Sequence, residues 1–335
     1  MEKRIWLIVI SLLICTAALP APLRAAPYYE GKVLRIIVGW EAGAGGYDRM
    51  ARIFARHLPK HIPGKPSVVV ENMSGAGSII AANYIYNIAK PDGLTIATVS
   101  RGLPYAQLTK VEGVKFDMMK YVWVGSASVE STVLTLRTDL SYKSIEDLQK
   151  AKKEIFVSGV GPGSPDVQFP LLLNMFLGLR LNIVTYQSSA AGMLALERKE
   201  VDGKAGSYSS FKIYIDRGLV HPILRGRASE PGIEKLPVDE DLAPDPKGKI
   251  MLAMRSVGDQ VGRPYVTPPK TPPEVMGILR EAFAKVTQDP ELKEDAMKSM
   301  LNFSYVPAEE CLKVLNRIFQ QPEEIVQEFG KYIKF

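Results

Sequence analysis

The sequence predicts an α/β protein built from two lobes. Short apolar runs alternate with segments of helical periodicity, and the same alternation begins again in the middle of the chain. Glycine-rich turns follow several of the apolar runs. Alternation with short connections is typical of parallel strands with helices on the faces of the sheet. The chain has 335 residues, 46% of them hydrophobic, which suffices for about two domains with buried cores.

The first lobe is predicted to begin with three strands separated by two helices. Apolar runs at 33–38, 68–70 and 94–99 predict the strands. Apolar residues at helical spacing predict helices over 50–58 and 79–86. Because a helix separates each strand from the next, the strands are expected to pair in parallel.

The second lobe is predicted to repeat this design. Apolar runs predict strands at 155–157 and 181–185, and helical spacing predicts helices over 169–177 and 190–198. The order of strand, helix, strand and helix is the same as in the first lobe. A second parallel arrangement with its own core is therefore expected.

The last part of the chain is predicted to be helical. Proline-containing helix start signals occur at 271–274, 289–290, 306–307 and 322. Because no strand pattern follows them, these helices are expected to pack back onto an existing sheet. The simplest path of the chain assigns 27–128 and 226–335 to lobe 1 and 129–225 to lobe 2.

The segment 1–26 has the features of a cleaved secretion signal. Lys3 and Arg4 precede an apolar run over 5–18 that is short for a membrane span. Small residues follow, and cleavage is expected near residue 25 or 26. We therefore expect a periplasmic protein that is released by cleavage of this signal. The alternative is that the segment stays uncleaved and serves as an N-terminal anchor.

The charge pattern argues against a nucleic-acid-binding protein, and the cysteine content argues against a disulfide-stabilised one. The net charge is +6, and the basic residues are interleaved with acidic and apolar ones, so no nucleic-acid-binding patch is predicted. Cys311 is the only cysteine after the predicted signal, so the fold cannot depend on an intramolecular disulfide. Cys311 lies within a helical pattern and is expected to be a buried small hydrophobic residue.

Three glycine-rich turns are the most informative feature of the sequence. They cover 43–46, 74–78 and 159–164, and each lies between a predicted strand and a helix. Ligands of open α/β sheets bind at this edge, where glycine permits close approach and helix N-termini offer free amide groups. Three such turns on two lobes predict an anion held between them. The alternative is that each is only a tight turn that requires left-handed backbone angles.

These turns do not match the known cofactor-binding motifs. A dinucleotide fingerprint needs glycine or alanine where Asp48, Ile80 and Asp166 stand. The sequence lacks a phosphate-binding loop, a nucleophile elbow and a histidine pair with zinc-ligand spacing. We therefore expect neither cofactor nor metal, and nothing in the sequence requires catalysis.

Ordered motifs in both halves carry a family resemblance over about 30–300. Those of the first half are 36–38, Gly46-x-Asp48-x-x-Ala51-Arg52, 69–72, 75–77 and Pro91-Asp92-Gly93-x-Thr95. Those of the second half are 158–164, 186–190, 200–203 and 271–274. Together they resemble the extracytoplasmic receptors of tripartite tricarboxylate transporters, also called the Bug family.

The resemblance implies a type II periplasmic-binding-protein fold with a cleft between two lobes. It implies that the protein binds a small organic carboxylate through backbone amides and waters and delivers it to membrane subunits of a secondary transporter. A sensor that presents its ligand to a signalling partner is an alternative, and an enzyme that acts on a carboxylate is another. A monomer is expected to close over its ligand by hinge motion.

The expected ligand-binding residues come from strand ends and glycine turns of both lobes. They are Trp40, Gly45, Gly46, Ser74, Gly75, Ala76, Arg101, Gly161, Gly163, Ser164, Tyr186, Ser188, Ser189 and Ser207. Trp40 is expected either to form a wall of the cleft or to lie in the core. Arg101 is expected either to pair with a ligand carboxylate or to face solvent.

One departure from the family pattern puts the identity of the ligand in question. The receptors usually carry proline and an aromatic residue after the first strand, whereas Gly39, Trp40 and Glu41 stand here. A glutamate near an anion site repels a carboxylate unless it faces away or pairs with a ligand amine.

Overall fold

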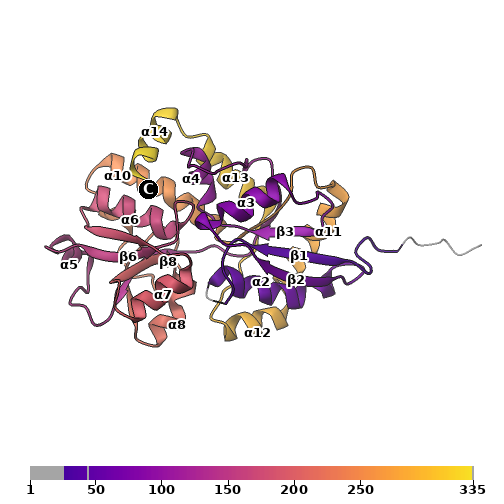
Figure 1. Cartoon of the computed structure of the whole chain (residues 1–335), viewed down its shortest axis with the longest axis horizontal. Coiled ribbons are helices and arrows are strands. Elements are labelled where there is room, and N and C mark those ends of the chain that lie inside the picture. Colours follow the sequence, from indigo (N-terminus) through magenta and orange to yellow (C-terminus); the bar gives the residue numbers. More distant parts are fainter. Residues whose placement is uncertain (1–25, 44, 334–335) are drawn as a thin grey trace, which may run out of the picture.

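Two sheets lie side by side along the long axis of the molecule (Figure 1). The computed structural model describes residues 26–43 and 45–333. The predicted signal peptide falls outside the described residues except for its last position. Within the described ranges, no helix is both long enough and apolar enough to cross a membrane.

The first sheet has six strands in the order β11-β4-β10-β3-β1-β2. Its strands are β1 (Val33–Val38), β2 (Ser67–Asn72), β3 (Thr95–Thr98), β4 (Val122–Ser126), β10 (Pro264–Thr267) and β11 (Val306–Pro307). β1 pairs in parallel with β2 and β3, as the alternating pattern predicts. β10 enters from the last third of the chain and pairs antiparallel between β3 and β4.

The second sheet has five strands in the order β7-β6-β8-β5-β9. They are β5 (Thr132–Arg137), β6 (Ile155–Gly159), β7 (Leu181–Thr185), β8 (Gly203–Ser207) and β9 (Val220–Arg225). β6 pairs in parallel with β7 and β8, and β5 pairs antiparallel with β8 and β9. The chain therefore passes between the sheets twice, from β4 to β5 and from β9 to β10.

Helices cover both sheets and bury their apolar faces. In the first part of the chain they are α2 (Gly46–His57), α3 (Ile79–Asn87), α4 (Leu103–Leu108) and the short helices η1 (Leu58–His61) and η2 (Ala76–Ser78). In the middle they are α5 (Ile145–Gln149), α6 (Pro165–Leu177), α7 (Ser189–Glu197), α8 (Tyr208–Asp216), α9 (Asp239–Leu242), α10 (Pro246–Val257) and η3 (Gly258–Val261). In the last part they are α11 (Pro273–Val286), α12 (Pro290–Lys298), α13 (Ala308–Phe319) and α14 (Glu323–Tyr332).

The predicted helix starts are nearly all confirmed. Asp289 caps α12, and α13 and α14 begin directly after a proline. The start signal at 271–274 leads to α11, but Thr271, which the signal places as the cap, does not cap the helix. Its hydroxyl donates to the Pro268 carbonyl, and the N-cap residue is Pro272. Cys311 is fully buried in α13 as predicted.

The C-terminal helix α14 contacts elements of both lobes. Phe329 packs on Tyr105 of α4, and Tyr332 packs on Phe176 of α6, with ring centroids 5.5 and 4.9 Å apart. α9 and α10 also contact α6, although β10 and β11 that follow them join the first sheet. The tail and the second crossover thus connect the two halves outside the sheets.

A buried ion pair fixes the path of the chain between β4 and β5. The Glu130 carboxylate lies 2.7 Å from the Arg263 guanidinium, and both side chains are almost fully buried. The Ser209 hydroxyl contacts both partners, at 2.7 Å from Glu130 and 2.8 Å from Arg263. The pair joins the first crossover to the second and to α8.

We predict that Glu130→Ala destabilises the protein by about 3–5 kcal/mol, because it leaves the Arg263 guanidinium buried without its carboxylate partner. Urea unfolding followed by circular dichroism measures the change. Glu281→Ala removes an exposed pair with Lys285 and should have little effect. Equal effects of the two substitutions would contradict this role for the buried pair.

A second buried carboxylate makes stability depend on pH. Burial raises the pKa of Asp239 to about 7, although the nearby Arg255 guanidinium, at 3.5 Å, opposes the rise. The folded protein therefore holds a proton on Asp239 that the unfolded chain releases near pH 4. The contribution of Asp239 to the free energy of unfolding is therefore fully present below the pKa of the unfolded chain. It is lost as the pH rises through the folded-state pKa of about 7.

We predict that Asp239→Asn reduces the loss of unfolding free energy between pH 5 and pH 8. The group itself accounts for on the order of 2–4 kcal/mol of that loss. Urea unfolding at the two pH values measures it. Asp241→Asn, on the same short helix but exposed and paired with Arg227, serves as the control and should leave the pH dependence in this range unchanged.

Candidate functional site

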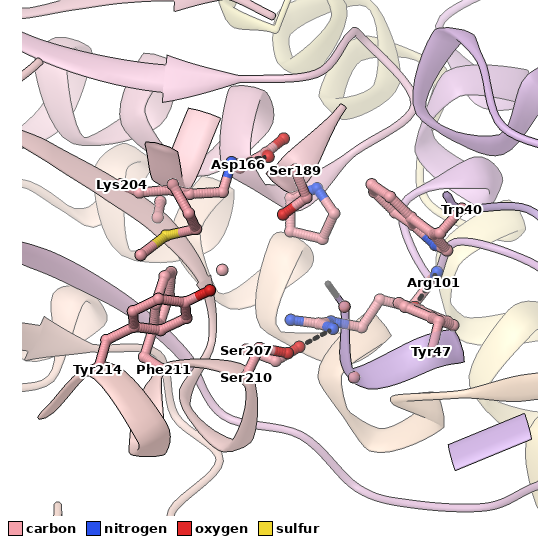
Figure 2. Close-up of a pocket in the computed structure, with 16 residues that line it drawn as sticks. Trp40, Tyr47, Arg101, Asp166, Ser189, Lys204, Ser207, Ser210, Phe211 and Tyr214 are labelled. Carbon is pink, nitrogen blue, oxygen red and sulfur yellow. Dashed lines mark hydrogen bonds and ion pairs between the residues drawn. The ribbon is translucent and has the colours of Figure 1, made fainter. Parts of the chain in front are cut away.

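A cavity of about 60 Å³ lies between the two sheets (Figure 2). It is lined by Trp40, Gly45, Gly46, Tyr47, Arg101, Pro165, Asp166, Ser189, Met193, Lys204, Ala205, Gly206, Ser207, Ser210, Phe211 and Tyr214. A water needs about 10–15 Å³ of such space. The lobes therefore enclose room for a few waters or a small organic molecule.

Four helices present their N-terminal ends to the cavity. α2 contributes from the first lobe, and α6, α7 and α8 contribute from the second. Each follows the carboxyl end of a strand, and the predicted glycine turns at 43–46 and 159–164 lead into α2 and α6. Because helix N-termini carry unpaired amide groups and a positive dipole end, the cavity favours an anion.

Two of these N-termini already hold a carboxylate of the protein itself. At α6, Asp166 pairs with Lys204 at 2.6 Å, and both side chains are buried. At α7, the Glu41 carboxylate reaches across from the first lobe and accepts a hydrogen bond from the Ala190 amide at 2.9 Å. Glu41 therefore faces the cleft, rather than away from it.

The N-termini of α2 and α8 have no side-chain cap. The N-cap residue of α2 is Gly45, which has no side chain. The N-cap residue of α8 is Ser207, whose hydroxyl accepts no hydrogen bond from an amide of the helix. A side chain at Gly46 would fall within 2.8 Å of the Ser210 hydroxyl and closer still to Arg263. Glycine at this position thus lets α2 and α8 approach each other across the cavity.

Arg101 connects both lobes at the floor of the cavity. Its Nε donates to Asp259 at 2.9 Å, and its terminal nitrogens donate to Ser207 and Thr132 at 2.8 and 2.9 Å. Burial opposes its charge, but the Asp259 carboxylate more than offsets this and the pKa of Arg101 lies above its usual value. The expectation that Arg101 faces solvent is wrong, since it is 4% exposed.

Aromatic side chains form much of the remaining wall. Trp40 stacks on Tyr47 with ring centroids 5.4 Å apart, and Phe211 and Tyr214 face them from α8 (Figure 2). The two alternatives for Trp40 both apply, because it lines the cavity and also packs into the core of the first lobe. Its indole Nε1 is buried without a hydrogen-bond partner among the described residues, and such a donor suits a ligand oxygen.

The other two glycine turns pack against each other instead of lining the cavity. A Cβ on Gly163 would lie 2.7 Å from the Gly77 carbonyl oxygen, and one on Gly77 would lie 2.8 Å from the Gly163 backbone. The Ser100 hydroxyl donates to the Gly163 carbonyl at 2.8 Å. Close approach of backbone therefore explains these glycines, with the opposite lobe as the contact.

The structure brings six of the predicted site residues together around the cavity. These are Trp40, Gly45, Gly46, Arg101, Ser189 and Ser207. The predicted residues outside its lining are Ser74, Gly75, Ala76, Gly161, Gly163, Ser164, Tyr186 and Ser188. Their contact with a ligand stays a prediction.

Several of these outer residues have a structural partner. The Ser188 hydroxyl caps α7 by accepting from the Ala191 amide at 3.0 Å. Ser164 occupies the N-cap position of α6, but its hydroxyl bonds Gly161 and Asp166 instead of capping the helix. In the α2 loop, Asp48 accepts from the Gly43 amide at 2.8 Å and so braces the turn.

Sequence reasoning missed part of the lining. The missed residues are Tyr47, Pro165, Asp166, Met193, Lys204, Ala205, Gly206, Ser210, Phe211 and Tyr214. In the sequence, Asp166 stands out only as a mismatch to the dinucleotide fingerprint. Lys204 lies in β8, a strand with two glycines and little apolar character, so no sequence signal marked it.

No cluster of metal-ligating side chains lines the cavity in the part of the chain described. One group of such residues, His57, Asp289 and Glu291, lies elsewhere. The Lys60 amine pairs with both of its carboxylates, at 2.6 and 2.8 Å. The group is therefore explained as an ion-pair cluster between η1 and α12.

We predict that Gly163→Val keeps the lobes apart, because the new side chain would collide with the backbone of residues 76–77. Small-angle X-ray scattering of the ligand-free protein should show a larger radius of gyration, with far-ultraviolet circular dichroism unchanged. Gly277→Val, on an exposed helix face with no atom near the new Cβ, is the matched control. An unchanged radius for the Gly163 variant would contradict the steric argument.

Comparison with known proteins places the chain in a family. The family model described as "Tripartite tricarboxylate transporter family receptor" matches residues 50–331. A UPF0065 protein from Cupriavidus necator is 24% identical over 323 residues, covering 94% of this chain and 92% of that protein.

Solved structures show the same fold. The periplasmic binding protein BugD has a TM-score of 0.74 at 21% identity, over 90% of this chain and 99% of its own. MatC from Rhodopseudomonas palustris with bound malate has a TM-score of 0.72 at 19% identity, over 88% and 99%. These matches confirm the predicted two-lobed periplasmic-binding-protein fold. The family match extends over most of the sequence, and the chain belongs to the tripartite tricarboxylate transporter family of receptors.

Proposed function

We propose that the protein is a periplasmic receptor that captures a small organic carboxylate between its lobes and delivers it to membrane subunits of a tripartite tricarboxylate-type transporter. Membership of the receptor family supports this function. The malate bound to the similar structure MatC supports a carboxylate as the kind of ligand. Because a single chain supplies both walls of the cavity, the receptor acts as a monomer.

One observation carries the proposal most directly. The uncapped N-termini of α2 and α8 meet across the cavity beside the buried Arg101 guanidinium. A carboxylate placed here can accept hydrogen bonds from backbone amides of both lobes, from the Ser207 and Ser210 hydroxyls and from the Trp40 indole. An anion seated here interacts with two lobes at once.

Binding then drives closure of the lobes. The ligand contacts both lobes only when they are closed, so it stabilises the closed form by its difference in affinity for the two forms. Contacts such as Ser100 with Gly163 and Arg101 with Ser207 form in the same state. The bound solute is released unchanged, because the proposed role needs no bond to be made or broken.

We predict that a small carboxylate raises the thermal midpoint of the protein, whereas the amide or alcohol of the same carbon skeleton does not. A ligand at 100 times its Kd stabilises the folded state by about 2.7 kcal/mol. A thermal-shift screen with matched acids and amides, followed by calorimetry, measures this. Recovery of the ligand chemically unchanged separates the receptor from an enzyme, and the absence of any carboxylate-specific shift would contradict the proposal.

Delivery to a transporter is tested separately. Deletion of the receptor from its host should abolish uptake of the radiolabelled carboxylate identified in the screen, and the unaltered chain should restore it. Normal uptake combined with loss of a transcriptional response would favour a ligand-presenting sensor instead.

A further inference from the structure

We infer that Glu41 is a built-in carboxylate that occupies one anion position of the cleft, so that the receptor selects solutes with one carboxylate and an apolar body. This inference rests on the proposed receptor function and adds the class of solute to it. Three features of the cleft carry it: the contact of Glu41 with α7, the pairing of the lining charges and the apolar character of the remaining wall.

Glu41 takes the place that an anion would occupy at the start of α7. Its carboxylate, from the loop after β1, accepts from the Ala190 amide at 2.9 Å. The next amide, of Ala191, donates to the Ser188 hydroxyl. Two of the first three amides of the helix are therefore used, and a ligand anion at this helix end would lie beside the Glu41 carboxylate.

The charge of Glu41 lies at the edge of the cavity. Trp40, directly before Glu41, and Ser189, directly before Ala190, both line the cavity. A second carboxylate on a solute that extends towards α7 would thus lie close to a fixed negative charge. Repulsion between like charges is strong where water is excluded, so such a solute is rejected.

The lining offers no cation to offset a second ligand charge. Within the described residues, the lining cations are Arg101 and Lys204, and each has a carboxylate partner, Asp259 and Asp166 respectively. Asp166, in the first turn of α6, already places a carboxylate of the chain at that helix end, where it pairs with Lys204. One anion position remains, between the N-termini of α2 and α8.

The rest of the wall suits an apolar body. Met193, Phe211, Tyr214 and the ring of Trp40 also line the space, as Figure 2 shows for the three aromatic side chains. Met193 and Phe211 are almost fully buried. A hydrocarbon chain or an aromatic ring gains from contact with these side chains, whereas a second ionised group would lose its hydration there without a partner.

Matched pairs of acids test the inference by calorimetry. The pairs are butanoate with succinate, hexanoate with adipate, and benzoate with terephthalate. The unaltered protein should bind the monocarboxylate of the pair that fits at least tenfold more tightly than the dicarboxylate. Glu41→Gln keeps an oxygen for the Ala190 amide but removes the charge, so it should reduce that ratio at least tenfold by strengthening dicarboxylate binding.

A control variant separates this local effect from overall charge. Glu197→Gln removes the same charge from the last turn of α7, where Glu197 pairs with Arg217, and should leave the ratio unchanged. Tighter binding of a dicarboxylate by the unaltered protein, or an unchanged ratio in Glu41→Gln, would overturn the inference and leave the receptor function intact. Binding of no acid from any pair would instead count against the carboxylate receptor itself, and the inference would fall with it.

Discussion

The ion pair between Arg101 and Asp259 is the constraint on which the closed structure depends. A buried guanidinium is tolerated only with a carboxylate and hydrogen-bond acceptors around it. Asp259 supplies the charge from η3, whereas Ser207 and Thr132 supply hydroxyl oxygens from the second sheet. Since Arg101 follows β3 of the first sheet and its partners come from the second sheet and from a crossover, satisfying Arg101 requires the lobes to meet. The cavity exists in its observed form because this residue holds the strand ends of both sheets together.

The lobes then approach through backbone as much as through side chains. The turns at Gly77 and Gly163 touch so closely that neither position has room for a Cβ. These two turns leave no space between the lobes where they touch. The cavity lies beside them, where the N-termini of α2 and α8 approach each other. A glycine turn after a strand therefore serves two purposes in this protein. The turn at 43–46 exposes the N-terminus of α2 to the cavity, whereas the turns at 74–78 and 159–164 form the contact between the lobes beside it.

The electrostatics of the cleft are more restrictive than four converging helix ends suggest. Helix N-termini favour anions, yet Asp166 and Glu41 already place carboxylates of the chain itself at two of them. The positive potential left for a ligand is concentrated at the remaining pair of helix ends. Affinity for a negatively charged group and discrimination between solutes with one and two such groups can thus come from the same small set of contacts.

The sequence by itself determined the local structure and the fold class. Periodicity located β1, β2, β3, β6 and β7 and the helices between them, because those strands are parallel and separated by amphipathic or apolar helices. Periodicity did not locate β4, β5, β9 and β10, which pair antiparallel, or β8, which pairs in parallel with β6 and antiparallel with β5. Their pairing joins segments far apart in the chain. The crossover order of the sheets is consequently a property of the tertiary structure.

For the site, the sequence identified turns that lie at the cleft but not which of them face the cavity. Gly45, Gly46 and Arg101 line it, whereas the turn at 159–164 meets the other lobe, and both outcomes fit the same local pattern. Lys204 and Glu41 acquire their roles only from partners 38 and 149 residues away. Local propensity fixes where a helix begins, but the closure of two lobes decides which charges meet, because that depends on distances in space that no stretch of sequence records.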